Sequence, residues 1–171
     1  MAVSVFENSC DKALTFILEP NREVYNLPPL AKIGVRYSFD PGVDERTFAD
    51  FGEHHIRFWC DSKRRDVEII SPNSFDLLLQ DICVRNGFCG GIVNGQPTHV
   101  TDLLPAGGLV TADEFARLVI RAEHDGDDPS DKVKRWTKLL TAKFVEHMGA
   151  IEAPAEALQR NLELPFDVDY R

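Results

Sequence analysis

The sequence predicts an α+β fold. An antiparallel β sandwich or barrel-like module is expected over residues 1–70, and a mainly helical region with a small β-hairpin near 88–101 is expected over 71–171. Two observations support this prediction. Short segments of alternating apolar and polar residues, separated by turn residues, fill the first part of the chain. Apolar residues at helical spacing, preceded by capping residues, dominate the second part.

The first part is expected to contain β segments at residues 12–19, 22–27, 32–39, 46–51, 54–60 and 66–70. The alternation is clearest in 32–39, where the residues that fall on one face are Ile33, Val35, Tyr37 and Phe39. This is the period of a half-buried strand. Segments this short and this close together are typical of a small sandwich or barrel.

The second part is expected to contain three main helices. Ser71-Pro72 begins the first, with Ser71 as the N-cap, and Thr111 begins the second, with Glu114 completing a capping box. The third begins near 128–131 and continues to Met148, with Trp136 predicted to be buried in its apolar stripe. A short fourth helix is expected after residue 154 and an extended tail over 164–171.

Composition excludes several function classes. The chain has 171 residues, a formal net charge of −9 and a pI of about 5.0, so binding to nucleic acids and to anionic membranes is disfavoured. No segment approaches the roughly 20 apolar residues of a membrane span. The N-terminal segment lacks the pattern of a signal peptide, so we expect a cytoplasmic protein whose cysteines, at positions 10, 60, 83 and 89, are reduced.

The glycine-rich stretch NGFCGGIVNGQPTHV, residues 86–100, is a candidate site. It matches neither a Walker A loop nor the dinucleotide-binding fingerprint. Cys89 with His99 could form a thiol and its base, but no third, orienting group can be identified. A structural interpretation is favoured, in which Gly87 ends a helix and Asn94-Gly95 forms a type I′ hairpin turn.

The histidines do not predict a metal site. His54 and His55 are adjacent on an expected strand and therefore point to opposite faces, while His99, His124 and His147 are scattered along the chain. The acidic run at 123–131 does not have the spacing of an EF-hand loop. The sequence therefore predicts no metal, no cofactor and no catalytic residues.

Basic residues are concentrated on the third helix of this acidic chain: Lys132, Lys134, Arg135, Lys138 and Lys143. An exposed helical face next to an acidic loop would explain them. The functional alternative is a docking patch for an acidic protein partner, with Lys134, Arg135 and Lys138 as the partner-binding residues.

The run LEPNREVYNLPP contains the residues Glu19, Pro20, Tyr25, Leu27 and Pro28. It resembles the opening of uncharacterised bacterial proteins that carry a Glu-Pro…Tyr-x-Leu-x-Pro stretch ahead of a small β module. The resemblance extends over the strands up to residue 70, and the Trp-Gly pair that often follows Glu-Pro is replaced here by Asn21-Arg22. It implies a bacterial origin and no known activity, so no functional residue is carried over.

We therefore expect a non-catalytic bacterial interaction or accessory protein, because no convergent nucleophile, base and stabiliser can be assembled from the chain. A homodimer is compatible with the sequence. Two alternatives remain open: a cupin-like enzyme or small-molecule binder that uses the interior of the β module, and a thiol enzyme based on Cys89 and His99. A β module whose interior is filled by Phe, Ile and Val would favour the interaction role.

Overall fold

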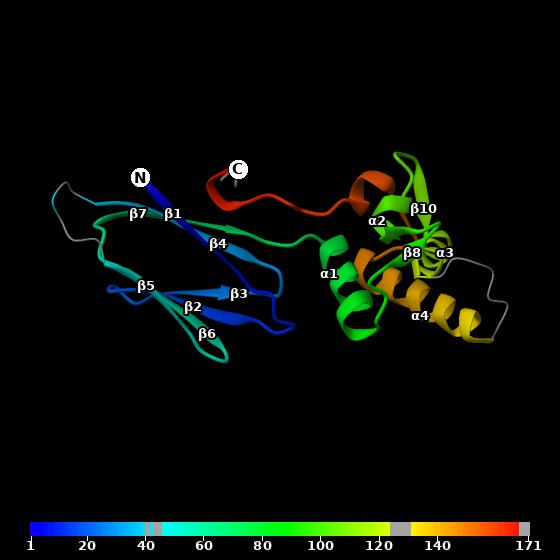
Figure 1. Ribbon diagram of the computed structural model, residues 1–171, viewed down its shortest axis with the longest axis horizontal. Helices are drawn as coiled ribbons and strands as arrows, with labels where there is room; N and C mark the ends of the chain where they lie inside the picture. The colour runs from blue at the N-terminus through cyan, green and yellow to red at the C-terminus, as the bar shows by residue number, and fades with distance from the viewer. Residues whose placement is uncertain (40–41, 43–45, 124–130, 168–171) are drawn as a thin grey trace. The chain divides into compact units, whose positions relative to one another are not determined.

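The computed structural model describes residues 1–39, 42, 46–123 and 131–167. The chain forms two compact units. The first unit consists of residues 1–72 and 162–171, and the second of residues 73–161. The first unit is built from strands and the second mainly from helices (Figure 1). An α+β fold is thus confirmed.

The first unit contains two sheets. The first sheet has the order β1-β4-β7, with strands Ala2–Glu7, Lys32–Ser38 and Arg64–Ile70, and all its pairs are antiparallel. The second sheet has the order β3-β2-β6-β5, with strands Glu23–Leu27, Leu14–Glu19, His55–Cys60 and Thr47–Phe51. Its central pair, β2 with β6, is parallel, which differs from the wholly antiparallel module predicted. The described residues form no closed barrel.

Side chains from both sheets fill the interior of the first unit. The fully buried residues include Phe16 and Leu18 on β2 and Ile33 and Val35 on β4, and Phe58 on β6 is only 3% exposed. The ring of Phe6 on β1 packs 5.1 Å from the ring of Phe58 and 5.3 Å from that of Phe16. The interior is therefore a dense aromatic and aliphatic core.

The C-terminal segment belongs to the first unit, although the sequence assigned it to the helical region. Its short 3₁₀ turn η3, Pro165–Asp167, packs against β4, where Gly34 leaves room for Pro165. The guanidinium of Arg36 lies 4.4 Å from the ring centroid of Phe166. The backbone N–H of Phe166 donates to Glu68. These contacts are not encoded by local periodicity, which explains why an extended tail was expected.

The second unit contains helices α1, α2, α3 and α4, which cover Ser74–Gln80, Val100–Leu103, Ala112–Glu123 and Asp131–Met148. A π-helical turn, η1 (Asp81–Arg85), continues α1, and a 3₁₀ turn, η2, covers Ala155–Leu158. Two small antiparallel pairs complete the unit: the hairpin of β8 with β9 (Gly91–Val93, Gln96–Thr98), and β10 with β11 (Leu109–Thr111, Glu152–Pro154), which are separated in the chain by α3 and α4.

The helices of the second unit enclose a separate core. Phe75 and Leu78 of α1, Phe115 of α3, and Leu140 and Phe144 of α4 are all fully buried there. The Phe115 ring lies between Phe75 and Phe144, with centroids 6.3 Å and 5.2 Å away. The apolar stripes read from the sequence therefore face one another in the structure.

Several local predictions for this unit are confirmed. Asn94 and Gly95 both have positive φ, 51° and 76°, in the turn between β8 and β9. Gly87, with φ of 77°, ends η1, and its N–H donates to the carbonyl of Cys83 at 2.9 Å. The hydroxyl of Thr111 accepts from the N–H of Glu114 at 3.2 Å, as a capping residue should.

Other local predictions are wrong. Ser71 is not the cap of α1, because Asn73 accepts from the N–H of Asp76 at 2.8 Å and the Asp76 side chain accepts from the N–H of Asn73. Trp136 is half-buried, because it lies at the flank of α4, against the edge of Phe88 and beneath the ammonium of Lys132.

None of the described helices has the length and apolar character needed to cross a membrane.

Candidate functional site

Helix α4 contributes to two polar features of the second unit, which share Glu146. The buried face is narrow, since Leu140 and Phe144 are the residues of α4 with full burial. One flank faces α1 and η1 and holds a cluster of charged side chains. The other flank faces α3 and borders an open groove. Each of the two features is a candidate site.

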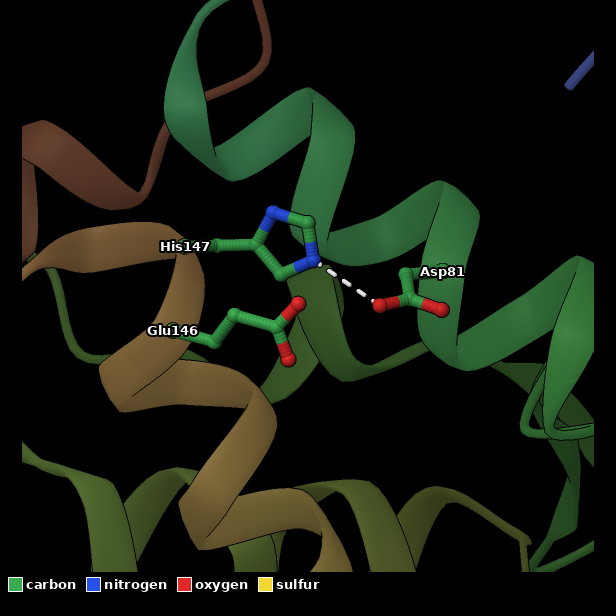
Figure 2. A group of neighbouring side chains, drawn as sticks. All are labelled: Asp81, Glu146 and His147. Atoms are coloured by element: carbon green, nitrogen blue, oxygen red, sulfur yellow. Dashed lines mark hydrogen bonds and ion pairs between the residues drawn. The ribbon is translucent and has the colours of Figure 1, made fainter. Parts of the chain in front are cut away.

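The charged cluster is centred on Asp81, at the start of η1, whose side chain is only 5% exposed. Its Oδ2 accepts a hydrogen bond from the ammonium of Lys143 at 3.0 Å. Nε2 of His147 lies 2.9 Å from the same oxygen and donates to it, since a carboxylate oxygen can only accept (Figure 2). Lys143 and His147 are one turn apart on α4, so both reach the same acceptor.

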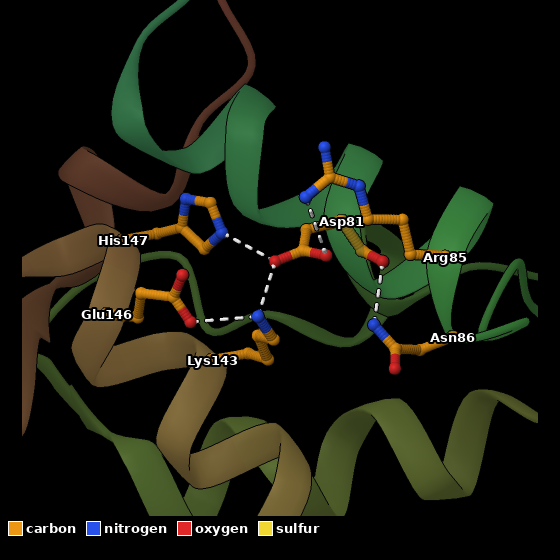
Figure 3. Close-up of polar contacts among 6 residues, drawn as sticks. All are labelled: Asp81, Arg85, Asn86, Lys143, Glu146 and His147. Carbon is orange, nitrogen blue, oxygen red and sulfur yellow. Dashed lines mark hydrogen bonds and ion pairs between the residues drawn. The ribbon is translucent and has the colours of Figure 1, made fainter. Parts of the chain in front are cut away.

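Glu146 and Arg85 extend this cluster (Figure 3). The ammonium of Lys143 also donates to Oε2 of Glu146 at 2.8 Å. Among the described residues, Oδ1 of Asp81 has no hydrogen-bond partner, and Nη1 of Arg85 lies 3.8 Å from it. The side-chain amide of Asn86 donates to the backbone carbonyl of Asp81 at 3.0 Å.

The charges in the cluster stabilise one another. Burial by itself would raise the pKa of Asp81, but the hydrogen bonds from His147 and Lys143 outweigh burial, so the pKa is lower than its ordinary value. The hydrogen bond to Glu146, followed by that to Asp81, raises the pKa of Lys143. Asp81 is therefore a carboxylate and Lys143 an ammonium over a wide pH range, and together they fasten η1 to α4.

Three of these side chains could in principle hold a metal ion. One ligand atom each from Asp81, Glu146 and His147 lies within 4.8 Å of the others. However, the ammonium of Lys143 already bridges Asp81 and Glu146. A divalent cation would have to displace Lys143 and would leave it beside a like charge. The cluster therefore fits the role of a structural ion network better than that of a metal centre, and the sequence expectation of no metal stays a prediction.

The second feature is an open groove of about 790 Å³ along the α3 side of α4. Its lining residues on α4 are Val133, Lys134, Thr137, Lys138, Thr141, Ala142, Val145 and Glu146, and α3 contributes Asp113. The hydroxyl of Thr141 donates to Oδ1 of Asp113 at 3.0 Å, which fixes the two helices to each other at this point. The groove thus combines a mostly apolar lining with charged side chains of both signs.

The groove includes two of the three residues that the sequence predicted to bind a partner. Lys134 and Lys138 line it, and Lys134 lies 3.6 Å from Asp131 with its side chain 81% exposed. Arg135 is exposed on the same helix and is not among the lining residues. The charged cluster around Asp81 was not predicted, although Lys143 and His147, four residues apart, give a local hint of a shared acceptor.

The other candidate residues do not gather into a site. His54 is exposed and lies 3.6 Å from Glu53, and His55 packs over Gly52, so neither enters the core of the first unit. His124 and most of the acidic run at 123–131 lie outside the described residues. His99 serves as the N-terminal cap of α2, and its N–H donates to Asp102 at 2.8 Å.

Cys89 forms a disulfide with Cys83 on η1, with a Cα–Cα distance of 4.5 Å. The expectation that all cysteines are reduced is therefore wrong for this pair, whereas Cys10 and Cys60 are not in a disulfide. A disulfide sulfur cannot act as the thiolate nucleophile that the Cys89–His99 alternative requires. The pairing was not predictable from spacing alone, since it depends on the chain reversing direction at Gly87.

Comparison with protein-family models, with curated proteins and with solved structures found no match. The resemblance to bacterial proteins with the Glu-Pro…Tyr-x-Leu-x-Pro stretch therefore stays a prediction. Function is inferred below from the geometry of the chain itself.

Proposed function

We propose that this chain is a non-catalytic interaction or accessory protein and that the groove along α4 is its docking surface. The groove itself is the observation that carries the proposal. Its lining is mostly apolar and includes Val133, Ala142 and Val145, together with charged side chains of both signs. Interfaces of moderate affinity combine an apolar centre with a polar rim in this way.

The properties of the rest of the molecule agree with a docking role. The two sheets of the first unit, which we take to be a small sandwich, enclose a core of large apolar side chains. This filled interior offers no support for a cupin-like binding site. In the second unit, Asp81 and Lys143 neutralise each other within the ion network. A catalytic base or nucleophile would need to be free to react.

The source and the compartment of the protein stay predictions. The sequence predicts a bacterial, cytoplasmic protein. Disulfides are typical of oxidising compartments, so the bond between Cys83 and Cys89 counts against the cytoplasmic location. The docking proposal does not depend on the compartment.

Site-specific photo-crosslinking tests the proposal. We would replace Ala142, an exposed lining residue, with p-benzoylphenylalanine and irradiate the protein in a lysate of the source cells. The matched control carries the same group at Arg121, an exposed position of α3 that does not line the groove. We expect a discrete crosslinked polypeptide, which can include a second copy of the chain, from position 142 alone. Equal crosslinking from both positions, or none from either, would contradict the proposal.

A further inference from the structure

The residues that line the groove on α4 come in adjacent pairs at intervals of four. The pairs are Val133-Lys134, Thr137-Lys138, Thr141-Ala142 and Val145-Glu146. Residues four apart on a helix form a continuous ridge. The groove side of α4 therefore bears two parallel ridges. One is the β-branched ridge Val-Thr-Thr-Val, and the other is the ridge Lys-Lys-Ala-Glu.

These ridges are complementary to themselves when the direction of the helix is reversed. In an antiparallel second copy, Val133 comes opposite Val145 and Thr137 comes opposite Thr141. On the neighbouring ridge, Lys134 comes opposite Glu146, and Lys138 comes opposite the small side chain of Ala142. Both matches place the two-fold axis at nearly the same height along α4, at the level of residues 139 and 140. Such a self-matching surface is the requirement for an isologous dimer.

The charges of the groove favour a second copy over an acidic partner. Lys134 and Lys138 belong to the N-terminal half of the lining of α4, whereas Glu146 and Asp113, which accepts from Thr141, belong to the other half, so the groove is formally neutral in a chain of net charge −9. A wholly acidic segment would be attracted to one half and repelled from the other. In a reversed copy, Lys134 of each chain lies opposite Glu146 of the other, so opposite charges meet twice.

The side chains concerned are available for contacts between chains. The Lys134 side chain is 81% exposed and that of Glu146 is 60% exposed. Each has one ion-pair partner on its own helix, Asp131 for Lys134 and Lys143 for Glu146. The pair between Lys134 and Asp131 is exposed on both sides and therefore weak, and Lys143 keeps Asp81 as a partner if Glu146 turns to a second chain.

We infer that the groove along α4 is the interface of a two-fold homodimer in which α4 packs antiparallel on α4 of a second copy, with Lys134 of each copy facing Glu146 of the other. This inference rests on the proposed docking function and specifies its partner. The interdigitating ridges at intervals of four correspond to a common class of helix packing in proteins. A contact between single helices is small, so we expect a dimer that dissociates on dilution.

Complementary charge reversal provides the test. Lys134→Glu sets two carboxylates against each other in both contacts of the dimer, and Glu146→Lys sets two ammonium groups against each other. Each variant alone should dimerise at least about tenfold more weakly than the parent in sedimentation velocity. An equimolar mixture of the two variants should recover dimers, because one of the two contacts then joins the introduced carboxylate to the introduced ammonium and the other keeps the original pair. Arg135→Glu, the matched control outside the groove, should dimerise as the parent does.

The outcomes separate this inference from the proposed function. Dimers that form in the mixture but in neither variant by itself support the two-fold packing. Any damage that a substitution does within its own chain is the same in the mixture, so it cannot explain the recovery. A parent protein that remains monomeric at every concentration, or a mixture that stays monomeric, overturns the inference. If the parent is monomeric but position 142 still crosslinks another protein in lysate, the docking function stands and the dimer does not. If position 142 crosslinks nothing, both are refuted.

Discussion

Replacing Asp81 with Asn tests whether the charged cluster is a structural ion network. The substitution keeps the size of the side chain and removes its charge. Asp81 is nearly buried, with its side chain 5% exposed, and its Oδ2 accepts from Lys143 at 3.0 Å and from His147 at 2.9 Å. The asparagine in its place could accept both bonds through its amide oxygen, but as a neutral acceptor, and its N–H groups would then replace Oδ1, which lies 3.8 Å from the guanidinium of Arg85.

The expected loss of stability follows from these contacts. A hydrogen bond to a charged group contributes about 1.5–3 kcal/mol and one between neutral groups about 0.5–1.5 kcal/mol, so weakening two bonds costs about 2 kcal/mol. Burying a neutral amide costs less than burying a carboxylate, which offsets part of this loss of stability. Lys143 and His147 are 23% and 20% exposed, so water can reach both after the change. We therefore expect Asp81→Asn to lower the free energy of unfolding by about 1.5–2 kcal/mol.

The effect should depend on pH in a defined direction. The pKa of Asp81 is lowered in the folded protein, so its contribution to stability is present above the ordinary value of 3.8 and is lost as the pH falls through the folded value. The pKa of Lys143 is raised, so its contribution is present below the ordinary value of 10.5 and is lost as the pH rises through the folded value. The difference between parent and variant should thus be largest between these limits.

Equilibrium unfolding in urea measures this difference. A Trp59→Phe background leaves Trp136, which packs against the core of the second unit, as the fluorescent reporter. Glu152→Gln is the matched control, because Glu152 is exposed on β11 of the same unit and the change should alter stability by less than about 0.5 kcal/mol. An Asp81→Asn variant as stable as its parent near neutral pH would refute the network, as would a difference that does not shrink in acid.

Three further outcomes are expected. In the folded protein, iodoacetamide should modify the exposed Cys10 and leave Cys83 and Cys89 unlabelled until a reductant is added. Cys60 should react slowly, because burial raises the pKa of its thiol. Labelling of Cys89 before reduction would contradict the disulfide. Gly95→Val should cost about 1–3 kcal/mol, because a β-branched residue is strained at a φ of 76°, whereas Gly107→Val should be tolerated better; equal stabilities by thermal melting would exclude the strained turn. Trp136→Ala should cost about 2 kcal/mol in urea unfolding, less than a fully buried tryptophan, and a loss near zero would mean that its contacts with the core are not made.

Much of the secondary structure was predictable because it depends on neighbours in the sequence. The alternation of residues 32–39 predicted β4, and the Asn94-Gly95 pair predicted the turn between β8 and β9. Both signals arise within a few residues. The N-cap of α1 was misplaced by two residues, since Ser71 and Asn73 are both good capping residues and only the contact with Asp76 distinguishes them.

Pairing over long distances in the sequence could not be predicted. The parallel pairing of β2 with β6 joins strands that are separated by three others, and no local pattern indicates its direction. Asp81 and His147 are 66 residues apart, so the ion network emerges only when α1 and α4 pack together. In the sequence, Asp81 is merely a polar residue within an apolar stripe.

The candidate docking surface was predictable in part. Lys134 and Lys138 were identified from the local reversal of charge in an acidic chain, and both line the groove. The acidic half of the groove was not identified, because Asp113 lies on a different helix and reaches the groove only through the packing of α3 against α4. The basic side chains of α4 taken alone predict a patch for an acidic partner.

Methyl NMR over a dilution series can show whether another copy of the chain docks in the groove along α4. The methyl groups of Val133, Ala142 and Val145 line the groove, whereas that of Val84, which is 67% exposed on η1, does not. If the groove is the dimer interface, the three groove resonances should shift together as the concentration rises, while Val84 stays fixed. Groove resonances that do not change with concentration, or shifts centred on Val84, would contradict a dimer formed through this groove.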